Sequence, residues 1–445
     1  MASTPFHVFP FAIPLVVVLF ASSSYSTSRL ETHGDVQKTI KNGFRVGLRH
    51  VDAGANFTKL EFLQRAMKRG RHRLARLSSS NTSSDIQSPV KGGNGEYLMN
   101  LAIGTPATSF DAIMDTGSDL IWTQCKPCTK CYKQPTPIFD PEQSSSFSKQ
   151  SCSSDLCNAL TMSKCNKGCE YLYSYGDEST TQGFLASETL TFDQVSVPHI
   201  GFGCGNDNEG SGFTQGAGLV GLGRGPLSLV SQLGLGKFSY CLTTIDDVKS
   251  SSTSSSLLFG SLADLNTNST QIKTTPLIQN PSQPSFYYLS LEGITVGDTL
   301  LDIPKSTFAL TKGGHGGVVI DSGTTITYLE KTGFALVKKA FVSQMKLPVV
   351  DATDSTGLDL CFSLPSDVSD NIEVPKLIFH FTGADLDLPG NNYMIADSSV
   401  GLICLAMGGS SGLSIFGNVQ QQNILVLHDL EKETLSFMPT KCNQL

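Results

Sequence analysis

Several residue patterns are missing from this 445-residue chain, and each absence narrows what the protein can be. The first 24 residues contain no Lys, Arg, Asp or Glu. They include the apolar run FAIPLVVVLFA, which is too short to span a bilayer and is typical of a secretory signal peptide. An N-terminal anchor or a core segment is the alternative. No later run of 18 apolar residues exists, so we expect a soluble, secreted mature protein with no membrane contact.

The motifs of several enzyme classes are missing as well. The eight histidines form no H-E-x-x-H for a zinc protease, and GFGCG and GLGRG lack the full dinucleotide-binding fingerprint. GGSSG (408–412) formally fits the nucleophile elbow of serine hydrolases, but it is a small-residue turn before an apolar strand. We therefore expect no cofactor.

No cysteine precedes residue 125, whereas 12 follow, and an even number in a secreted chain predicts up to six disulfides. Seven lie between Cys125 and Cys169, beginning with CKPCTKC. This spacing could open a zinc or iron–sulfur site, but no matching Cys or His pair follows, so we expect no metal. Spacing alone leaves the connectivity open. The candidates for disulfide formation are Cys125, Cys128, Cys131, Cys152, Cys157, Cys165, Cys169, Cys204, Cys241, Cys361, Cys404 and Cys442.

Charge is distributed unevenly along the chain. Residues 25–80 hold 12 Lys/Arg against 4 Asp/Glu, and the residues after 80 hold 20 against 35. A basic segment can bind nucleic acid, but secretion argues against that partner. We interpret residues 25–80 as a propeptide that lies against an acidic body and inhibits it, and that acid releases by protonating carboxylates. Within it, apolar residues at helical spacing predict a helix over 57–77.

The residues after about 80 are expected to form an all-β protein. Short apolar or alternating runs are separated by turn residues in a chain with 42 Gly. Short helices are expected at 225–234 and 331–345. We expect two β-rich lobes with a cleft between them, over 81–270 (with a cysteine-rich insertion at 125–169) and 271–445. Sequons for N-glycosylation occur at Asn56, Asn81 and Asn268.

One motif occurs twice. AIMDTGSDLIW (112–122) and VVIDSGTTITY (318–328) each place an aspartate at the tip of an apolar strand. Each is followed, about a hundred residues later, by an apolar pair that ends in Gly, at Gly221 within GLVGLG (218–223) and at Gly417 within LSIFGN (413–418). The same parts in the same order indicate two related lobes.

Two such aspartates can meet across a pseudo-twofold axis. Carboxylates a few ångströms apart share one proton and titrate as a pair, as in the aspartic-protease dyad that is the standard example of this behaviour. The carboxylate can take a proton from a bridging water while the acid polarises a carbonyl.

DTGSDLIW, DSGTTITY, YGD and the two apolar-Gly stretches resemble the pepsin-type aspartic proteases, and the cysteine-rich segment after Trp122 resembles the nepenthesin branch of plant enzymes. The resemblance covers about residues 95–442 and implies a secreted, monomeric acid endopeptidase made as a zymogen, acting on proteins or peptides in the extracellular space or the vacuole. A catalytically silent relative that acts as an inhibitor or binding module is the alternative.

The resemblance also implies residue roles. Asp115 and Asp321 would be the catalytic pair. Tyr175 would be the tip of a flap over the substrate, with Trp122 as its buttress. Cys241 would pair with Cys442, and Cys361 with Cys404. The supporting residues would be Thr116, Gly117, Ser118, Ser322, Gly323 and Thr324 at the pair, and Gly176 and Asp177 in the flap.

Overall fold

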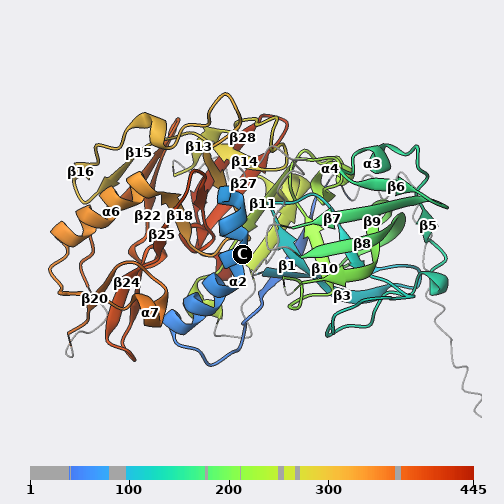
Figure 1. The fold of residues 1–445 in the computed structure, drawn as a ribbon, viewed down its shortest axis with the longest axis horizontal. Helices are drawn as coiled ribbons and strands as arrows, with labels where there is room; N and C mark the ends of the chain where they lie inside the picture. Colours follow the sequence, from blue (N-terminus) through green and yellow to red (C-terminus); the bar gives the residue numbers. More distant parts are fainter. Residues whose placement is uncertain are drawn as a thin grey trace, which may run out of the picture.

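The computed structural model describes residue 40 and residues 42–79, 97–175, 179–210, 212–248, 255–265, 271–365 and 372–445, with the backbone alone for 71–79. Most of the described elements are β-strands, which confirms the expected all-β class. Figure 1 shows two β-rich lobes side by side, the N-terminal lobe in green and the C-terminal lobe in yellow to red. Helix α2 (Lys59–Ser79) lies between them and confirms the helix expected over 57–77.

Some predictions concern residues outside this description. They are the signal peptide (1–24), the sequons at Asn81 and Asn268, and the flap residues Gly176 and Asp177. Among the described residues, no helix is both long and apolar enough to cross a membrane.

One 15-stranded sheet runs through both lobes. Its strand order is β13-β28-β27-β11-β12-β1-β2-β3-β10-β4-β9-β8-β7-β6, with β5 paired to β8. The two lobes share backbone hydrogen bonds, because β11 of the first pairs with β27 of the second. The bounds are β1 Phe44–His50, β2 Tyr97–Ile103, β3 Thr108–Asp115, β4 Trp122–Gln124, β5 Ser148–Lys149, β6 Ser163–Cys165, β7 Cys169–Ser174, β8 Thr180–Phe192, β9 Val195–Glu209, β10 Gly218–Gly221, β11 Lys237–Cys241, β12 Ser255–Phe259, β13 Lys273–Pro276, β27 Ile424–Asp429 and β28 Thr434–Pro439.

Strand β1 comes from the predicted propeptide, and the sequence analysis missed it. It lies between β12 and β2 and is antiparallel to both. Alternate residues from Phe44 to His50 are buried and the intervening ones are exposed, which is the period of a half-buried strand. This segment is therefore built into the central sheet.

Three smaller sheets belong to the C-terminal lobe, with strand orders β14-β17-β26-β18-β25, β16-β15-β21-β22 and β19-β20-β24-β23. The first of them carries the second aspartate motif. The bounds are β14 Tyr287–Leu289, β15 Leu291–Val296, β16 Thr299–Leu300, β17 Val318–Ile320, β18 Thr327–Glu330, β19 Val349–Val350, β20 Cys361–Ser363, β21 Leu377–Phe381, β22 Ala384–Leu388, β23 Met394–Asp397, β24 Leu402–Leu405, β25 Met407–Ser410 and β26 Ser414–Phe416.

The two helices expected in the body are present as α4 (Leu229–Leu233) and α6 (Lys331–Gln344). The Ser228 side chain caps α4 by accepting a hydrogen bond from Ser231 N at 3.2 Å, and Gly234, with φ 63°, ends it. The remaining helices are single turns: α3 Asp155–Asn158, α5 Ile245–Val248, α7 Thr353–Thr356 and the 3-10 turns η1 Pro141–Gln143, η2 Gly260–Ala263, η3 Lys305–Thr307, η4 Gly390–Asn392, η5 Val419–Gln421 and η6 Cys442–Gln444.

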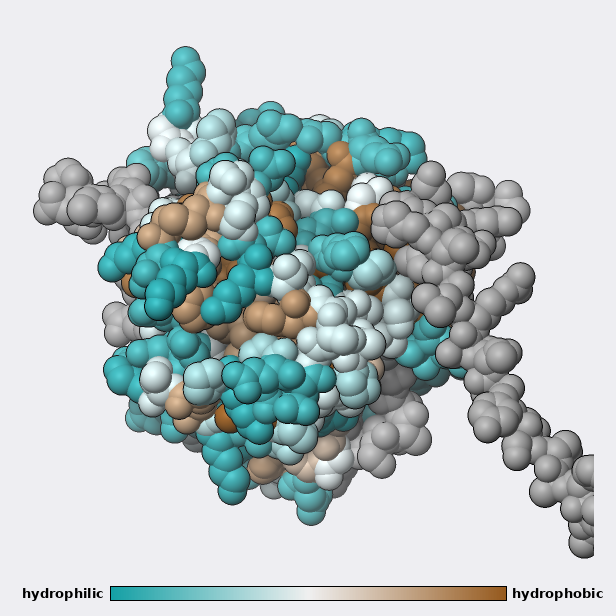
Figure 2. All heavy atoms as spheres, turned by 90° about the vertical axis from the view of Figure 1, so that its right-hand side faces the viewer, coloured by the Kyte–Doolittle hydropathy of each residue, from teal (hydrophilic) through white to brown (hydrophobic). Residues whose placement is uncertain are grey.

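All 12 cysteines are paired in disulfides, including the Cys128–Cys131 pair inside CKPCTKC. The end of the molecule that faces the viewer in Figure 2 is mostly hydrophilic, with only small apolar patches. In the cysteine-rich insertion, the disulfides add to apolar contacts such as those of the buried Phe139 and Leu160. The bonds are Cys125–Cys204, Cys128–Cys131, Cys152–Cys165, Cys157–Cys169, Cys241–Cys442 and Cys361–Cys404.

Candidate active site

The two aspartates of the repeated motif lie at equivalent strand ends. Asp115 is the last residue of β3, and Asp321 directly follows β17. Strand β10 runs parallel to β3, with Gly221 beside Asp115, and β26 runs parallel to β17. The two apolar-Gly stretches noted in the sequence therefore flank the two aspartate strands in the same way.

The backbone of each aspartate loop passes very close to the glycine that ends its flanking stretch. A Cβ atom on Gly221 would lie 2.3 Å from the carbonyl carbon of Asp119. A Cβ on Gly417 would lie equally close, at 2.3 Å, to the carbonyl carbon of Ile326. Only glycine allows this approach, which explains why both stretches end in that residue.

The two carboxylates have matching hydrogen bonds. Asp115 Oδ1 accepts from Gly117 N at 3.0 Å, and its Oδ2 accepts from the Ser118 hydroxyl at 2.5 Å. Asp321 Oδ1 accepts from Gly323 N at 2.9 Å, and its Oδ2 accepts from the Thr324 hydroxyl at 2.6 Å. Both side chains are buried. Each carboxylate is thus held in a fixed orientation by its own loop.

The two loops also bind each other. The Thr116 hydroxyl accepts a hydrogen bond from Ser322 N at 3.0 Å and donates to Asp321 Oδ1 at 3.3 Å. Its oxygen is also 3.2 Å from the Ser322 hydroxyl. The structure therefore brings together all eight residues, 115–118 and 321–324, that the resemblance placed at the pair.

Other polar side chains support the second loop, and the sequence analysis missed them. Asn418 Nδ2 donates to Ser322 O at 3.0 Å, and Gln421 Nε2 donates to Asp321 O at 3.3 Å. Both are buried. The available signal was the polar run NVQQQ (418–422), which directly follows an apolar strand where an exposed turn would be expected.

Tyr175 follows β7 and is buried, although the resemblance places it at the tip of a flap. Trp122 Nε1 donates to its hydroxyl at 2.8 Å, and Tyr175 N donates to Ser179 O at 2.8 Å. The Phe213 ring meets the Trp122 and Tyr175 rings edge-on. Burial raises the pKa of the Tyr175 phenol well above its ordinary value, as do the neighbouring Tyr173 and the negative charge of Asp115, so the hydroxyl stays protonated.

The residues that the structure describes contain no group of three or more His, Cys, Asp or Glu side chains placed to hold a metal ion. The chemistry of the site is therefore considered from the two carboxylates and their hydrogen-bond donors.

A bilobal β fold that buries a pair of aspartates on facing Asp-(Thr/Ser)-Gly loops is the arrangement of the pepsin-like class of aspartic proteases. Residues 97–261 match the family described as "Xylanase inhibitor N-terminal", and residues 286–439 match "Xylanase inhibitor C-terminal". The chain is 53% identical over 431 residues to aspartic proteinase nepenthesin-1 of Nepenthes gracilis, covering 96% of each sequence. It is 50% identical over 446 residues to nepenthesin-2 of the same plant, covering 99% of each.

Similar solved structures agree on the fold. The crystal structure of edgp superposes with a TM-score of 0.64 at 20% identity, over 91% of this chain and 96% of that one. Basic 7S globulin from soybean gives a TM-score of 0.61 at 21% identity, over 80% of this chain and 97% of that one. The sequence relatives decide the family: the chain belongs to the nepenthesin family of plant aspartic proteases. It is an aspartic-type endopeptidase, and the alternative of a silent binding protein is not favoured.

Proposed function

We propose that Asp115 and Asp321 are the catalytic pair of a secreted acid endopeptidase that is made as a zymogen. The observation that carries this proposal is the matched set of hydrogen bonds, in which each carboxylate binds the amide two residues on and the hydroxyl three residues on. All of these groups come from one chain, which supports a monomeric enzyme. The lobes that supply them are 81–270 and 271–445.

The pair acts on a water molecule held between its carboxyl groups. With one proton shared, the ionised carboxylate removes a proton from the water as its oxygen attacks the scissile carbonyl carbon. The protonated carboxyl donates its proton to the carbonyl oxygen, which becomes a hydroxyl of the tetrahedral intermediate. In the collapse, one hydroxyl of the intermediate gives its proton to the ionised carboxylate as its C=O bond forms and the C–N bond breaks. The amine leaves with the proton of the other carboxyl, so the pair again holds one proton. No covalent enzyme intermediate forms.

The substrate is an extended stretch of a protein or peptide. Tyr175, with Gly176 and Asp177 after it, is proposed to cover the bound peptide. The bond from Trp122 holds the base of this flap in place. Gly117 and Gly323, which have no side chains, leave the backbone of each loop accessible to the substrate.

Residues 25–80 are proposed to be the inhibitory propeptide, and the structure offers specific contacts for this role. Lys59 Nζ forms an ion pair with Asp246 Oδ2 at 2.8 Å, and Arg49 Nη2 forms one with Asp111 Oδ2 at 3.0 Å. Partly exposed pairs of this kind contribute only about 0–1 kcal/mol each. The buried side chains of Leu60 and Leu63 and the ladder of β1 therefore supply most of the attachment.

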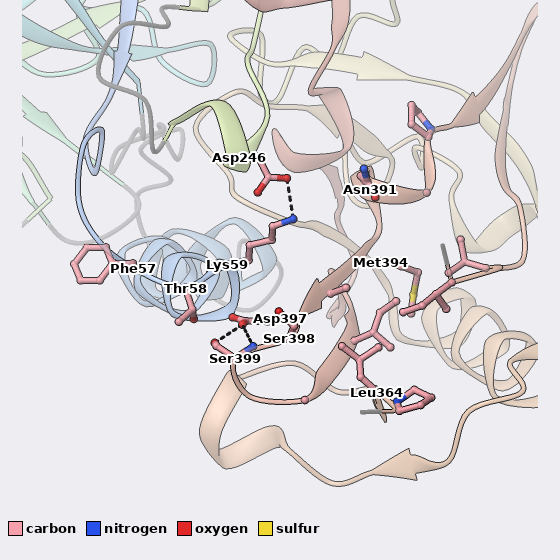
Figure 3. A pocket seen from close by; sticks show the side chains of 18 of the residues that line it. Phe57, Thr58, Lys59, Asp246, Leu364, Asn391, Met394, Asp397, Ser398 and Ser399 are labelled. Atoms are coloured by element: carbon pink, nitrogen blue, oxygen red, sulfur yellow. Dashed lines mark hydrogen bonds and ion pairs between the residues drawn. The ribbon is translucent and has the colours of Figure 1, made fainter. Parts of the chain in front are cut away.

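The start of α2 also forms one wall of a cavity of about 1350 Å³ (Figure 3). Most of the other lining residues come from the C-terminal lobe, including Leu364, Met394 and Asp397, and Asp246 comes from the N-terminal lobe. Removal of the propeptide would open this cavity to solvent along one side. Asn56 is exposed at this wall, which suits a glycosylation site.

Cleavage of an unfolded protein by the processed enzyme across pH tests the proposal. We expect cleavage to increase in acid and to disappear in Asp115→Asn and in Asp321→Asn. The variant Asp298→Asn changes an exposed turn residue and serves as the matched control. Full activity in either dyad variant would refute the catalytic assignment. A folded wild type without cleavage at any pH, or a full-length chain that is active without processing, would refute the endopeptidase or the zymogen proposal respectively.

A further inference from the structure

Asp119 is a third buried carboxylate close to the pair, and the mechanism above gives it no role. It lies four residues after Asp115, whereas the C-terminal repeat has Thr325 at the corresponding position. Asp119 is only 7% exposed to solvent. A buried carboxylate is costly unless specific partners hold it, so its contacts are informative.

The Asp119 carboxylate connects two segments that are distant in sequence. Oδ1 accepts a hydrogen bond from Gly225 N at 2.9 Å, and Oδ2 accepts from the hydroxyl of Ser285, which lies just before β14. An amide can only donate, and two donors at one carboxyl group favour its ionised form. One partner belongs to the N-terminal lobe and the other to the C-terminal lobe.

The loop that receives this carboxylate is shaped to admit it. A Cβ atom on Gly223 would lie 2.4 Å from Asp119 Oδ1, and a Cβ on Gly225 would lie 2.3 Å from Oδ2. The sequence GLGRG (221–225), which does not fit a dinucleotide site, thus forms a cradle for the Asp119 side chain. Arg224 N adds a second link across the lobes by donating to Ser285 O at 3.1 Å.

The same loop is hydrogen-bonded to the residues of the catalytic pair. Leu222 N donates to Asp115 O at 2.8 Å, and Gly223 N donates to Ser118 O at 2.8 Å. From the C-terminal lobe, the Tyr287 hydroxyl donates to Leu222 O at 2.6 Å. A change in how the 221–225 loop sits against Ser285 would therefore move Asp115.

We propose that Asp119 is a positioning residue that fixes Asp115 relative to the C-terminal lobe, and hence to Asp321, through the 221–225 loop and Ser285. This inference rests on the proposed catalytic pair. The negative charge of Asp119 also acts on the neighbouring phenol of Tyr173. The titratable and charged groups around Asp119 include Asp115, Tyr173 of β7, Tyr287 of β14 and Arg224 of the loop.

Asp119 N donates to the Tyr173 hydroxyl at 3.2 Å. Burial raises the pKa of Tyr173 well above its ordinary value, and the charges of both Asp119 and Asp115 add to this effect. The pKa of the Tyr173 phenol is therefore affected by both carboxylates.

The test compares Asp119→Asn with the wild type by kcat and KM of the processed enzyme. The asparagine keeps the size of the side chain and one acceptor but removes the charge. We expect kcat to fall roughly 10- to 100-fold with KM nearly unchanged, as for a small misplacement of a catalytic group.

Ser285→Ala keeps the charge of Asp119 and removes only its link across the lobes, so it should also lower kcat with KM nearly unchanged. It also decides the positioning role if Asp119→Asn fails to fold. Wild-type kcat in both variants, or a loss confined to KM, would overturn the inference. Asp298→Asn is the control, and Asp115→Asn reports separately on the catalytic pair. Activity in Asp115→Asn would refute the proposed function, whereas a dead Asp115→Asn beside a fully active Asp119→Asn would refute only the role of Asp119.

Discussion

The backbone amide of Leu60 in α2, part of the proposed propeptide, donates a hydrogen bond to Asp397 Oδ2 in the C-terminal lobe at 3.1 Å. Leu60 lies in the first turn of α2, where amides lack partners within the helix. Asp397 therefore caps this helix from a different part of the chain. Figure 3 shows the carboxylate beside the helix start, with further bonds from Ser399.

This contact predicts that Asp397→Asn makes the propeptide easier to release. Burial tends to raise the pKa of Asp397, but hydrogen bonds from Ser399, Thr58 and Leu60 outweigh it and lower the pKa below its ordinary value. The ionised form of Asp397 thus favours attachment of α2 to the C-terminal lobe. The stabilisation from this carboxylate is complete above the ordinary carboxyl pKa of about 3.9, and it is lost as the pH falls through the lowered pKa of Asp397. The asparagine lacks this charge-assisted contribution, about 1–2 kcal/mol, at every pH.

Conversion of the full-length chain to the processed form, followed by gel electrophoresis across pH, measures this effect. We expect conversion of Asp397→Asn to begin at higher pH than that of the wild type. Asp359→Asn, an exposed residue of the same lobe, should convert like the wild type. Identical conversion of all three proteins would show that Asp397 does not hold the helix.

His428 sets a limit to stability in strong acid. His428 lies on β27 and is fully buried. Its ring is stacked on that of Phe238, with the two ring centroids 4.5 Å apart, and neither ring nitrogen has a hydrogen-bond partner among the described residues. Burial lowers the pKa of His428 to about 3, with a smaller effect from the positive Arg224. The unfolded chain binds this proton at about pH 6.5, so stability is complete above that pH and falls as the pH drops toward 3.

His428→Phe removes the group that must bind a proton. We expect the variant to keep, at pH 3, on the order of 3–5 kcal/mol of unfolding free energy that the wild type loses between pH 6.5 and 3. Urea unfolding at a series of pH values measures this difference, with the exposed His315→Gln as control. Parallel pH curves for His428→Phe and the wild type would contradict the prediction.

The disulfides should differ in their contribution to stability according to the chain length that each closes. Cys241–Cys442 spans 201 positions, whereas Cys128–Cys131 spans 3. In the chain-entropy account, removing the long bridge costs about 5 kcal/mol and removing the short one about 2 kcal/mol. Urea midpoints of the paired Cys→Ser variants test the order, and an equal or reversed order would mean that strain or residual structure dominates.

Sequence reasoning was most successful where the pattern is local. The repeated motif predicted that two loops would meet, and the structure places them in direct contact through Thr116 and Ser322. The body helices were predicted from apolar spacing alone. Strand β1 was missed although its residues alternate, because charge dominated the interpretation of that segment.

Contacts between distant residues that share no repeated motif could not be predicted in this way. Nothing in the sequence pairs Asp119 with Ser285, which lie 166 positions apart. The insertion disulfides were left open for the same reason, since spacing does not determine which cysteines meet.

Trp122 and Tyr175 should behave as one coupled unit, and a double-mutant cycle tests this. In Trp122→Phe, the buried Tyr175 hydroxyl loses its donor, and in Tyr175→Phe the indole N–H loses its acceptor. Each single change should cost about 1–3 kcal/mol of stability, and each should lower kcat/KM because the base of the flap loosens. The double variant leaves neither group unpaired, so its loss should be smaller than the sum of the two by about 1 kcal/mol.

Tyr132→Phe is the matched control for this cycle. The Tyr132 ring packs near the same Phe213, and its buried hydroxyl has no hydrogen-bond partner among the described residues, so its removal should leave stability and kcat/KM unchanged or slightly improved. Coupled losses of kcat/KM in the first two variants, with none in Tyr132→Phe, would tie the hydrogen bond to substrate turnover. Additive losses would mean that the two aromatic side chains contribute through separate packing and that this bond does not hold the flap.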